Sequence, residues 1–362
     1  MKKPSLTFCV VGNLIGRNTG FVTTQGLLLA ELLAEGGFDV IAVSSKLNRL
    51  RRLFEICWTI VRSWRRIDVL IVEVYSGLGF FLADATSLLA RILGIPSVLV
   101  LHGGSFPEFT ESHAGWVKRV LGRAEALVAP SSFLADRMLR YGFGMRVIPN
   151  VIDLDSYAYR LRQKISPKLF WMRSFHPIYN PQMALDAFAA VKRELPEATL
   201  VMAGVDKGLE DAIKSSAIRM GLHDAVRFPG FLDEDAKIRE FSGADIYMNT
   251  NRIDNMPVSV VEACAMGLPV VATDVGGLSR LIDHGENGLL VGDDDPNEMA
   301  DAIMTLLRDP DLTERLSRNG RSLAEKSAWT VVRRAWEVLF DEILTPETGS
   351  DRRQSSASLM EP

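Results

Sequence analysis

Two acidic residues, Asp254 and Glu262, have seven residues between them, in a segment suited to an anionic ligand that carries hydroxyl groups. An ionised carboxylate accepts several hydrogen bonds, so it can bind paired hydroxyls. The pattern predicts a strand end followed by a helix, with Asn255 as the helix cap and Pro257 in the first turn. The amino end of such a helix favours anions. A simpler interpretation, with Asp254 as a cap and Glu262 as a solvated helix residue, stays open at this point.

The residues around this acidic pair resemble a family signature. The retaining glycosyltransferases of family 4, also called group 1, carry Glu, seven residues, Glu and then Ala-Met-Ala-x-Gly-x-Pro-Val-Val-Ala-Thr-Asp-x-Gly-Gly. Here the signature becomes Asp254, seven residues, Glu262 and the run from Ala263 to Gly277. The resemblance covers nearly the whole chain through the segments 12–20, 101–104, 147–153, 200–208, 226–230 and 284–291. It implies the GT-B fold, an α/β architecture of two Rossmann-like, doubly wound parallel-sheet domains that face an interdomain cleft.

The same resemblance implies a role for each matching residue. Glu262 would hold the donor ribose hydroxyls and Asp254 would contact the transferred sugar. Arg173 stands where the family places the arginine that neutralises the leaving diphosphate, a role that suits a guanidinium because it spans two phosphate oxygens. His102 would project toward the reacting sugar, although a loop or core histidine remains an alternative. The implied donor-binding residues are Gly16, Arg173, Gly204, Lys207, Asn255 and Glu262.

Three departures from the family pattern concern the donor contacts. The family usually has a Lys-Gly pair shortly after its arginine, whereas this chain continues from Arg173 to Asn180 and Pro181 without one. Lys207 is therefore our candidate for the missing charge. Asp at position 254 is one methylene shorter than the usual Glu, and Pro257 and Arg280 stand where many members carry Gly and Glu. These departures indicate a subfamily with altered donor contacts.

The resemblance also implies the reaction. A nucleotide-sugar donor, UDP- or GDP-linked, would pass its sugar with retention of configuration to a glycan or a polyprenyl- or lipid-linked acceptor, in polysaccharide or cell-envelope biosynthesis. The leaving diphosphate and an oxocarbenium-like sugar must be stabilised away from water. We expect no metal, because the sequence has no convincing Asp-x-Asp loop and the resemblance implies metal-independent transfer. We expect no cofactor, because the nucleotide sugar is a substrate. Domain closure would bring His102 to Arg173 and Glu262, which would grip opposite ends of one nucleotide sugar across the interdomain gap.

Short apolar runs alternate with helical patterns along the chain, which is typical of parallel α/β sheets. These runs predict the strands that would position the site residues. We expect strands at 6–11, 39–43, 69–74, 97–101, 126–129, 146–148, 168–172, 199–203, 226–228, 245–248, 270–272 and 288–291. The expected units are an acceptor-side domain at 1–160, a donor-binding domain at 161–330, a helix at 331–345 that packs back across the junction, and a disordered tail at 346–362.

Charge and cysteine usage favour a cytoplasmic protein. Residues 1–165 carry 20 basic and 13 acidic side chains, whereas the remainder carries 21 and 32, so the positive excess lies in the first half and favours an anionic partner there. Cys9, Cys57 and Cys264 lie in apolar runs and predict reduced core thiols. We expect no signal peptide, no membrane-spanning segment and no nucleic-acid partner.

One segment of the basic half combines cations with aromatic residues. Residues 46–66 would form a helix with an aromatic and aliphatic face and many cations, which is typical of a helix that rests on an anionic membrane. An ordinary connecting helix that covers the sheet is the alternative. The protein would then be peripheral, on the inner face of the membrane.

Two other functions remain open. One is a sugar-nucleotide epimerase of the same fold, although no suitable acid and histidine set for proton transfer is evident. The other is a catalytically degenerate protein that binds a nucleotide sugar. A Rossmann dehydrogenase is disfavoured, since the loop at 12–20 lacks the Gly-x-Gly-x-x-Gly spacing.

Overall fold

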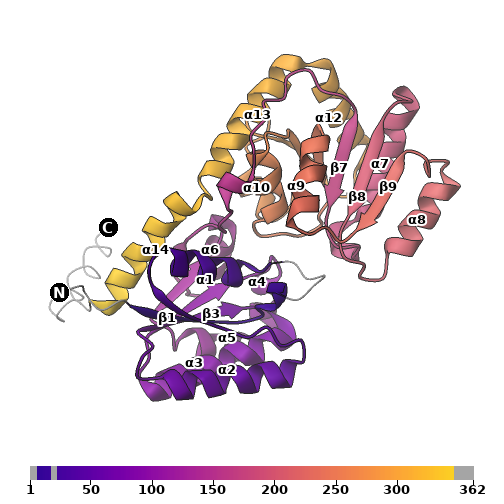
Figure 1. Cartoon of the computed structure of the whole chain (residues 1–362). Coiled ribbons are helices and arrows are strands. Elements are labelled where there is room, and N and C mark those ends of the chain that lie inside the picture. Colours follow the sequence, from indigo (N-terminus) through magenta and orange to yellow (C-terminus); the bar gives the residue numbers. More distant parts are fainter. Residues whose placement is uncertain (1–5, 18–22, 346–362) are drawn as a thin grey trace, which may run out of the picture.

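The computed structural model of the chain describes residues 6–17 and 23–345. It shows two six-stranded sheets in which every paired strand is parallel, one in each half of the chain (Figure 1). The first sheet has the order β2 (Asp39–Val43), β1 (Thr7–Val11), β3 (Val69–Val74), β4 (Ser97–Leu101), β5 (Ala126–Ala129), β6 (Arg146–Val147). The second has the order β12 (Leu289–Val291), β11 (Val270–Thr273), β10 (Ile246–Asn249), β7 (Lys168–Met172), β8 (Thr199–Ala203), β9 (Val226–Gly230). The predicted doubly wound α/β fold is confirmed.

Helices cover both faces of the first sheet, which explains why a strand such as β3 is buried along its whole length. One face packs against α2 (Arg49–Ser63), α3 (Phe80–Leu93), α5 (Ala114–Leu121) and α6 (Ser132–Leu139). The other face packs against α1 (Gln25–Glu35) and α14 (Trp329–Leu344). The short helix α4 (Phe106–Ser112) follows β4.

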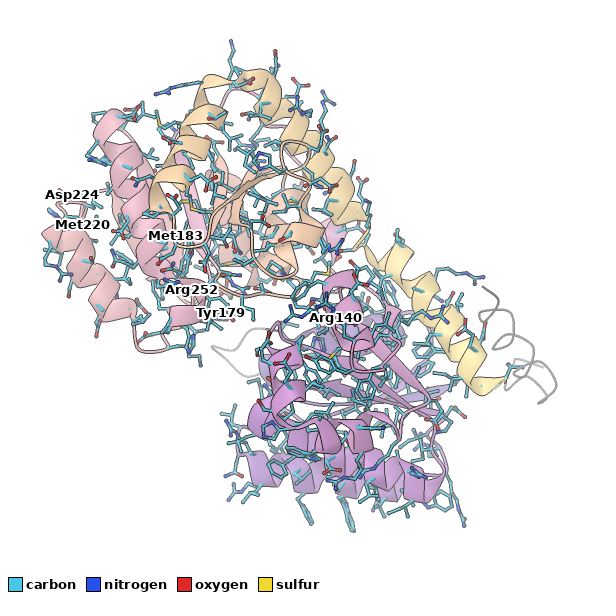
Figure 2. All side chains as sticks on the ribbon, turned by 180° about the vertical axis from the view of Figure 1, so that it is seen from behind. Arg140, Tyr179, Met183, Met220, Asp224 and Arg252 are labelled. Atoms are coloured by element: carbon cyan, nitrogen blue, oxygen red, sulfur yellow. The ribbon has the colours of Figure 1, made fainter. Side chains whose placement is uncertain are left out.

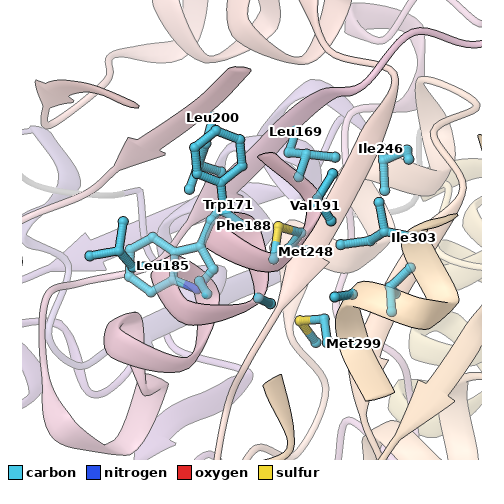
Figure 3. Close-up of a cluster of buried hydrophobic side chains, with 14 of the residues drawn as sticks. Leu169, Trp171, Leu185, Phe188, Val191, Leu200, Ile246, Met248, Met299 and Ile303 are labelled. Carbon is cyan, nitrogen blue, oxygen red and sulfur yellow. The ribbon is translucent and has the colours of Figure 1, made fainter. Parts of the chain in front are cut away.

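The second sheet is covered in the same way. One face packs against α7 (Pro181–Glu194), α8 (Glu210–Arg219) and α12 (Pro296–Arg308). Figure 3 shows the centre of this core, where Trp171, Phe188 and Met248 lie together. The other face packs against α9 (Glu234–Gly243), α10 (Val258–Ala265) and α13 (Pro310–Glu325), and a short helix, α11 (Leu278–Leu281), precedes β12.

The last described helix, α14, belongs to the core of the first sheet although it follows the second in sequence. Its Phe340 ring lies 4.3 Å from the ring of Phe8, centroid to centroid, and Trp336 is buried in the same cluster. Figure 1 shows α14 beside the first domain and α13 with the second. The predicted tail, 346–362, lies outside the described residues.

The carboxyl ends of the two sheets approach each other at a seam. The loop after β4 reaches the loop after β10, because a Cβ built on Gly104 would lie 2.9 Å from the carbonyl carbon of Asp254. The Asn150 side chain donates a hydrogen bond to the Met256 carbonyl across the same seam, 3.1 Å away. Ligands of doubly wound sheets bind at this edge, so the seam is where a site should be sought.

The three cysteines are free, and burial raises the pKa of Cys9 and of Cys264 to about 12. Cys57 is only partly buried. Within the described residues, no helix has the length and apolar character that a bilayer crossing needs.

Candidate active site

Sheet topology brings Arg173 and Asp254 together. Arg173 directly follows β7, and Asp254 lies in the loop after β10, the strand that pairs with β7. Neighbouring parallel strands end at the same edge, so residues 81 positions apart in sequence become neighbours. Tyr179 lies in the segment after β7 and Arg252 lies in the loop after β10. Figure 2 shows both residues at the edge of the second domain that faces the first.

Arg173 and Asp254 form a largely buried ion pair. The Arg173 Nη2 lies 2.5 Å from Asp254 Oδ2, and the guanidinium stacks 4.2 Å above the ring of Tyr179. Asp254 also accepts from Asn251 Nδ2 at 2.6 Å and from the Asn255 backbone N–H at 2.7 Å. Burial alone would lower the pKa of Arg173, but Asp254 together with Tyr179, Tyr247 and Glu262 outweighs burial, so the net pKa is raised. The cation is therefore fixed in place and permanently charged.

Glycines allow the site loops to approach this closely. Gly204, with φ +146°, lies so close to Arg173 that an added Cβ would be 1.9 Å from the Arg173 carbonyl oxygen. An added Cβ on Gly277 would lie 1.6 Å from the Asn255 carbonyl oxygen. Gly204 therefore packs directly against the Arg173 backbone, and its role in donor binding stays a prediction.

Glu262 is a buried acceptor on the second turn of α10, with 7% of its surface exposed. Its Oε1 accepts from the Tyr157 hydroxyl at 2.8 Å and from Lys237 Nζ at 2.6 Å. Burial acts to lower the pKa of Lys237, but the carboxylates of Glu262 and Glu234 raise it overall. The alternative of a solvated helix residue is therefore wrong for Glu262.

Arg173 and Glu262 share one region of the second domain. The Glu262 carboxylate is among the charges that raise the pKa of Arg173, and both act on Tyr247, whose pKa is raised mainly by burial. Both groups lie in the predicted donor-binding domain, because the loop after β7 and helix α10 both belong to the second sheet. That they hold opposite ends of one nucleotide sugar stays a prediction. The interdomain cleft itself stays a prediction.

Asn255 does not cap α10. The helix begins at Val258 with Pro257 before it, and it has no side-chain cap. Instead, the Asn255 Oδ1 accepts a short hydrogen bond from Ser131 Oγ, at the start of α6 in the first domain. Ser131 and Asn255 therefore link the domains, and the Asn255 Nδ2 has no hydrogen-bond partner among the described residues.

On the first-domain side, His102 follows β4 and is buried, with 9% of its surface exposed. Its Nε2 lies 2.5 Å from Oε2 of Glu73, in the neighbouring strand β3. Gly16 lies in a short 3-10 turn after β1, and the continuation of its loop to Gly20 passes beyond the described residues.

In the segment after Arg173 where the family usually carries its Lys-Gly pair, this chain has the start of helix α7. Asn180 caps α7 by accepting from the Met183 N–H at 3.4 Å, and its Nδ2 donates to Asp294 at 2.9 Å. Lys207 follows Asp206, whose carboxylate accepts from the backbone N–H groups of Gly208, Leu209 and Glu210, just before and at the start of α8. The Lys207 side chain is exposed. A phosphate contact by Lys207 remains a prediction.

Sequence reasoning missed several side chains that complete the site. Lys237 on α9 and Tyr157 in the segment between the sheets hold Glu262, while Tyr179 and Asn251 hold Arg173 and Asp254. Lys237 had no local signal, because a single lysine on a polar helix is ordinary. Glu73 did have one, since a carboxylate inside an otherwise apolar strand is unusual.

Two family descriptions match consecutive parts of the chain. "Glycosyl transferases group 1" matches residues 161–323, and "Glycosyltransferase Family 4" matches residues 21–156. The first match contains Arg173, Asp254 and Glu262, and the second contains His102.

Curated relatives and solved structures agree with these matches. A "phosphatidyl-myo-inositol mannosyltransferase" of Mycobacterium leprae is 29% identical over 64% of this chain and 61% of its own length. A "D-inositol 3-phosphate glycosyltransferase" of Paenarthrobacter aurescens is 31% identical over 67% of this chain and 65% of its own length. The chain thus matches less than two thirds of either relative.

Among solved structures, Anabaena HepE in complex with UDP and glucose has a TM-score of 0.71 at 20% identity, covering 92% of this chain and 99% of HepE. Sucrose-phosphate synthase from Thermosynechococcus elongatus has a TM-score of 0.72 at 18% identity, covering 98% and 100%. At such identities the likeness concerns the fold, and it confirms the predicted GT-B architecture.

Proposed function

Because this chain belongs to the group 1 glycosyltransferases of family 4, we propose that it transfers a sugar from a nucleotide-sugar donor to a glycan or lipid-linked acceptor. The observation that carries the proposal is the gathering of Arg173, Asp254 and Glu262 at one edge of the second sheet. The UDP and glucose in the HepE structure and the mannosyltransferase name of the mycobacterial relative support a nucleotide-sugar donor. A role in polysaccharide or cell-envelope assembly follows from such an acceptor.

In this proposal the bound donor takes the place of contacts that the site residues make with one another, above all the ion pair between Arg173 and Asp254. The diphosphate binds the Arg173 guanidinium, which offers several N–H donors in a fixed plane. Asp254 is thereby released to contact the transferred sugar. At the other end, the ribose hydroxyls donate to Glu262, beside Lys237 and Tyr157. Each new contact forms in a largely buried region, where charge-assisted hydrogen bonds are strong.

The chemical step in this proposal needs no covalent intermediate. The bond between the anomeric carbon and the diphosphate oxygen breaks, and Arg173 stabilises the negative charge that develops on the leaving diphosphate. The acceptor hydroxyl attacks the anomeric carbon from the same face and passes its proton to the leaving diphosphate oxygen, so that configuration is retained. His102 lies on the first domain and would meet the reacting sugar when the domains close. We propose that the reaction proceeds without a metal ion.

The test is a transfer assay over a panel of UDP- and GDP-sugars with glycan and polyprenyl-phosphate acceptors. The proposal predicts transfer from one donor with retained anomeric configuration and no loss of rate in chelator. Inverted product or a chelator-sensitive rate would contradict the mechanism. Binding without transfer or donor hydrolysis would favour the degenerate binding protein, and a 2-epimer as product would favour the epimerase.

Lys207→Ala tests the proposed second phosphate cation. Losing one exposed charge-assisted contact is expected to weaken nucleoside-diphosphate binding about 3- to 10-fold, as measured by titration calorimetry. Lys214→Ala, which removes a partly exposed lysine of α8 that pairs with Glu210, serves as the control and should leave affinity unchanged. Equal affinity of Lys207→Ala and the unaltered chain would remove Lys207 from the site.

We further propose that the acceptor is reached at a membrane surface through α2. Its inner face is held by Ile56 and Ile60, whereas Leu50, Phe54 and Trp58 form an exposed stripe with 79%, 71% and 57% of their surfaces accessible. Helix α3 lies beside α2 on the same side of the domain (Figure 1). It too carries exposed apolar side chains. Of eighteen large exposed apolar residues in the described chain, ten lie on these two helices or their ends: Leu47, Leu50, Phe54, Val61, Trp58, Trp64, Leu78, Phe81, Leu88 and Ile92.

Charge on the same segment favours a lipid surface over a protein partner. Lys46, Arg49, Arg51, Arg62, Arg65 and Arg66 are exposed around the apolar stripe. The one acid of α2, Glu55, accepts a short hydrogen bond from Ser44 and is partly buried. Aromatic residues with flanking cations are the composition of an interfacial helix, and each cation near an anionic bilayer contributes about 1 kcal/mol.

Flotation with liposomes tests this surface. The unaltered chain should float with phosphatidylglycerol vesicles at low salt, and Phe54→Ser/Trp58→Ser should reduce the floating fraction at least 5-fold, because about 2 kcal/mol of apolar burial per ring is lost. Ile218→Ser, which changes an equally exposed residue on α8, should float normally. Failure of the unaltered chain to float at low salt would refute membrane binding.

A further inference from the structure

Glu73 is a carboxylate in the interior of the first domain, with 3% of its surface exposed. It lies in β3 between apolar residues that are all buried. Burying an unpaired carboxylate is strongly unfavourable, so such a group persists only where a partner compensates it. The reaction scheme above gives Glu73 no role.

The partner is His102. Oε2 of Glu73 lies 2.5 Å from Nε2 of His102 in an ion-pair contact, and neither atom makes a hydrogen bond of regular geometry to any described residue. A carboxylate oxygen only accepts, so the proton of such a contact belongs to Nε2. This assignment leaves Nδ1 as the ring nitrogen available to other groups.

The surroundings hold the pair in one arrangement. A Cβ added to Gly12 would lie 2.6 Å from the Cβ of Glu73, and a Cβ added to Gly26 would lie 2.5 Å from the Cδ of Glu73. Glycine at both positions therefore leaves room for the Glu73 side chain. The ring of His102 stacks on Tyr75, with centroids 5.1 Å apart and planes at 21°. The His102 backbone N–H donates to the Val74 carbonyl at 2.9 Å. The imidazole is therefore fixed by its backbone, one ring face and Nε2.

This pair lies near the seam opposite the Arg173–Asp254 pair. Gly104, two residues after His102, is the point at which the first domain contacts the Asp254 backbone. A sugar held between Asp254 and the first domain would thus meet the segment that carries His102.

We propose that Glu73 is a positioning residue, which accepts the Nε2–H of His102 and thereby directs Nδ1, as a hydrogen-bond acceptor, toward a hydroxyl group of the bound carbohydrate. The part that concerns carbohydrate rests on the proposed sugar transfer; the proton position does not. A fixed tautomer matters because Nδ1–H would meet the hydroxyl oxygen as a donor and reverse the direction of the contact.

Nitrogen NMR tests the proton position without any activity. The full chain is labelled with 15N-histidine, and the His102 signals among the five histidines are identified by their loss in His102→Asn. At about pH 9, where an ordinary imidazole is neutral, we expect a protonated Nε2 and a bare Nδ1 at His102. A protonated Nδ1, or a mixture of tautomers, would overturn the proposal whether or not the protein transfers sugar.

Matched variants then separate positioning from a structural role. Glu73→Met keeps an unbranched side chain but removes the acceptor, and replacing a buried ionic group by an apolar one is often tolerated. We expect it to release the His102 tautomer and to lower kcat about 10- to 100-fold with donor KM within 3-fold. Glu73→Gln keeps an oxygen acceptor, so it should retain the His102 tautomer and most of kcat. If Glu73→Met does not fold, Glu73→Gln still tests the role of Glu73.

A double-variant cycle gives the final discrimination. If Glu73 acts through the imidazole, adding Glu73→Met to His102→Asn should change kcat by less than 2-fold. Independent, multiplicative losses would show that Glu73 acts on the fold alone. If the NMR result holds while no variant or parent transfers sugar, the positioning of His102 stands and the proposed transfer fails.

Discussion

Arg173→Ala is expected to lower the sugar-transfer rate about 10²- to 10³-fold. The guanidinium is the one cation in contact with Asp254 among the described residues, and removing a preorganised group that stabilises developing negative charge has an effect of this size. The loss should appear mainly in kcat, because the charge grows as the diphosphate leaves. Steady-state kinetics with saturating acceptor measures it.

Two further arginine variants test the interpretation of this result. Arg173→Lys keeps the charge but cannot span two oxygens or stack on Tyr179 in the same way, so it should recover less than a tenth of the lost rate. Arg308→Ala removes an exposed arginine at the end of α12 that pairs with Glu194 of α7, and it should leave kcat unchanged. An Arg173→Ala enzyme that is folded and retains more than a third of kcat would contradict the assigned role.

Glu262→Gln is expected to weaken donor binding about 10- to 100-fold. Hydrogen bonds to a charged acceptor are worth about 1.5–3 kcal/mol, and the amide also leaves the buried Lys237 with less compensation. Donor KM and calorimetric Kd should rise together while kcat changes less, because the ribose contact exists in both ground and transition states.

Glu234→Gln provides a matched control. Glu234 accepts from Tyr157 at 3.0 Å and pairs with Lys237 at 3.0 Å, as Glu262 does, but its side chain is 56% exposed. If Glu262 acts by binding ribose, only its own substitution should weaken the donor. Equal effects of the two variants would show that the Tyr157–Lys237 cluster, and not ribose contact, determines affinity.

The strands were highly predictable because parallel strands are buried on both faces and read as apolar runs. Six strands begin and end at the expected residues, namely β2, β3, β4, β5, β7 and β8, and the other six differ by at most two positions at an end. Helix α10 was less well predicted: it starts after Pro257, so Asn255 is free to contact Ser131 of the first domain. A cap motif in sequence cannot reveal such a competing long-range partner.

The site was predicted in composition but not in geometry. The signature segment identified Asp254 and Glu262, yet nothing local indicates that Arg173 pairs with Asp254 or that Tyr157 reaches Glu262, since both contacts depend on strand order. Likewise, the sequence of α2 shows cations and aromatic residues at helical spacing, but it does not indicate which face of the helix packs on the sheet and which is exposed. The structure decides it, because Ile56 and Ile60 take the inner face.

The central claim is that Arg173 and Glu262 bind the phosphate end and the ribose end of one nucleotide. Its most direct test is the affinity of each variant for a nucleoside diphosphate, by calorimetry, and for the corresponding nucleoside, by NMR titration. We predict that Arg173→Ala weakens only the diphosphate, whereas Glu262→Gln weakens both ligands by a similar factor. Unchanged diphosphate affinity in Arg173→Ala, or unchanged nucleoside affinity in Glu262→Gln, would contradict the claim.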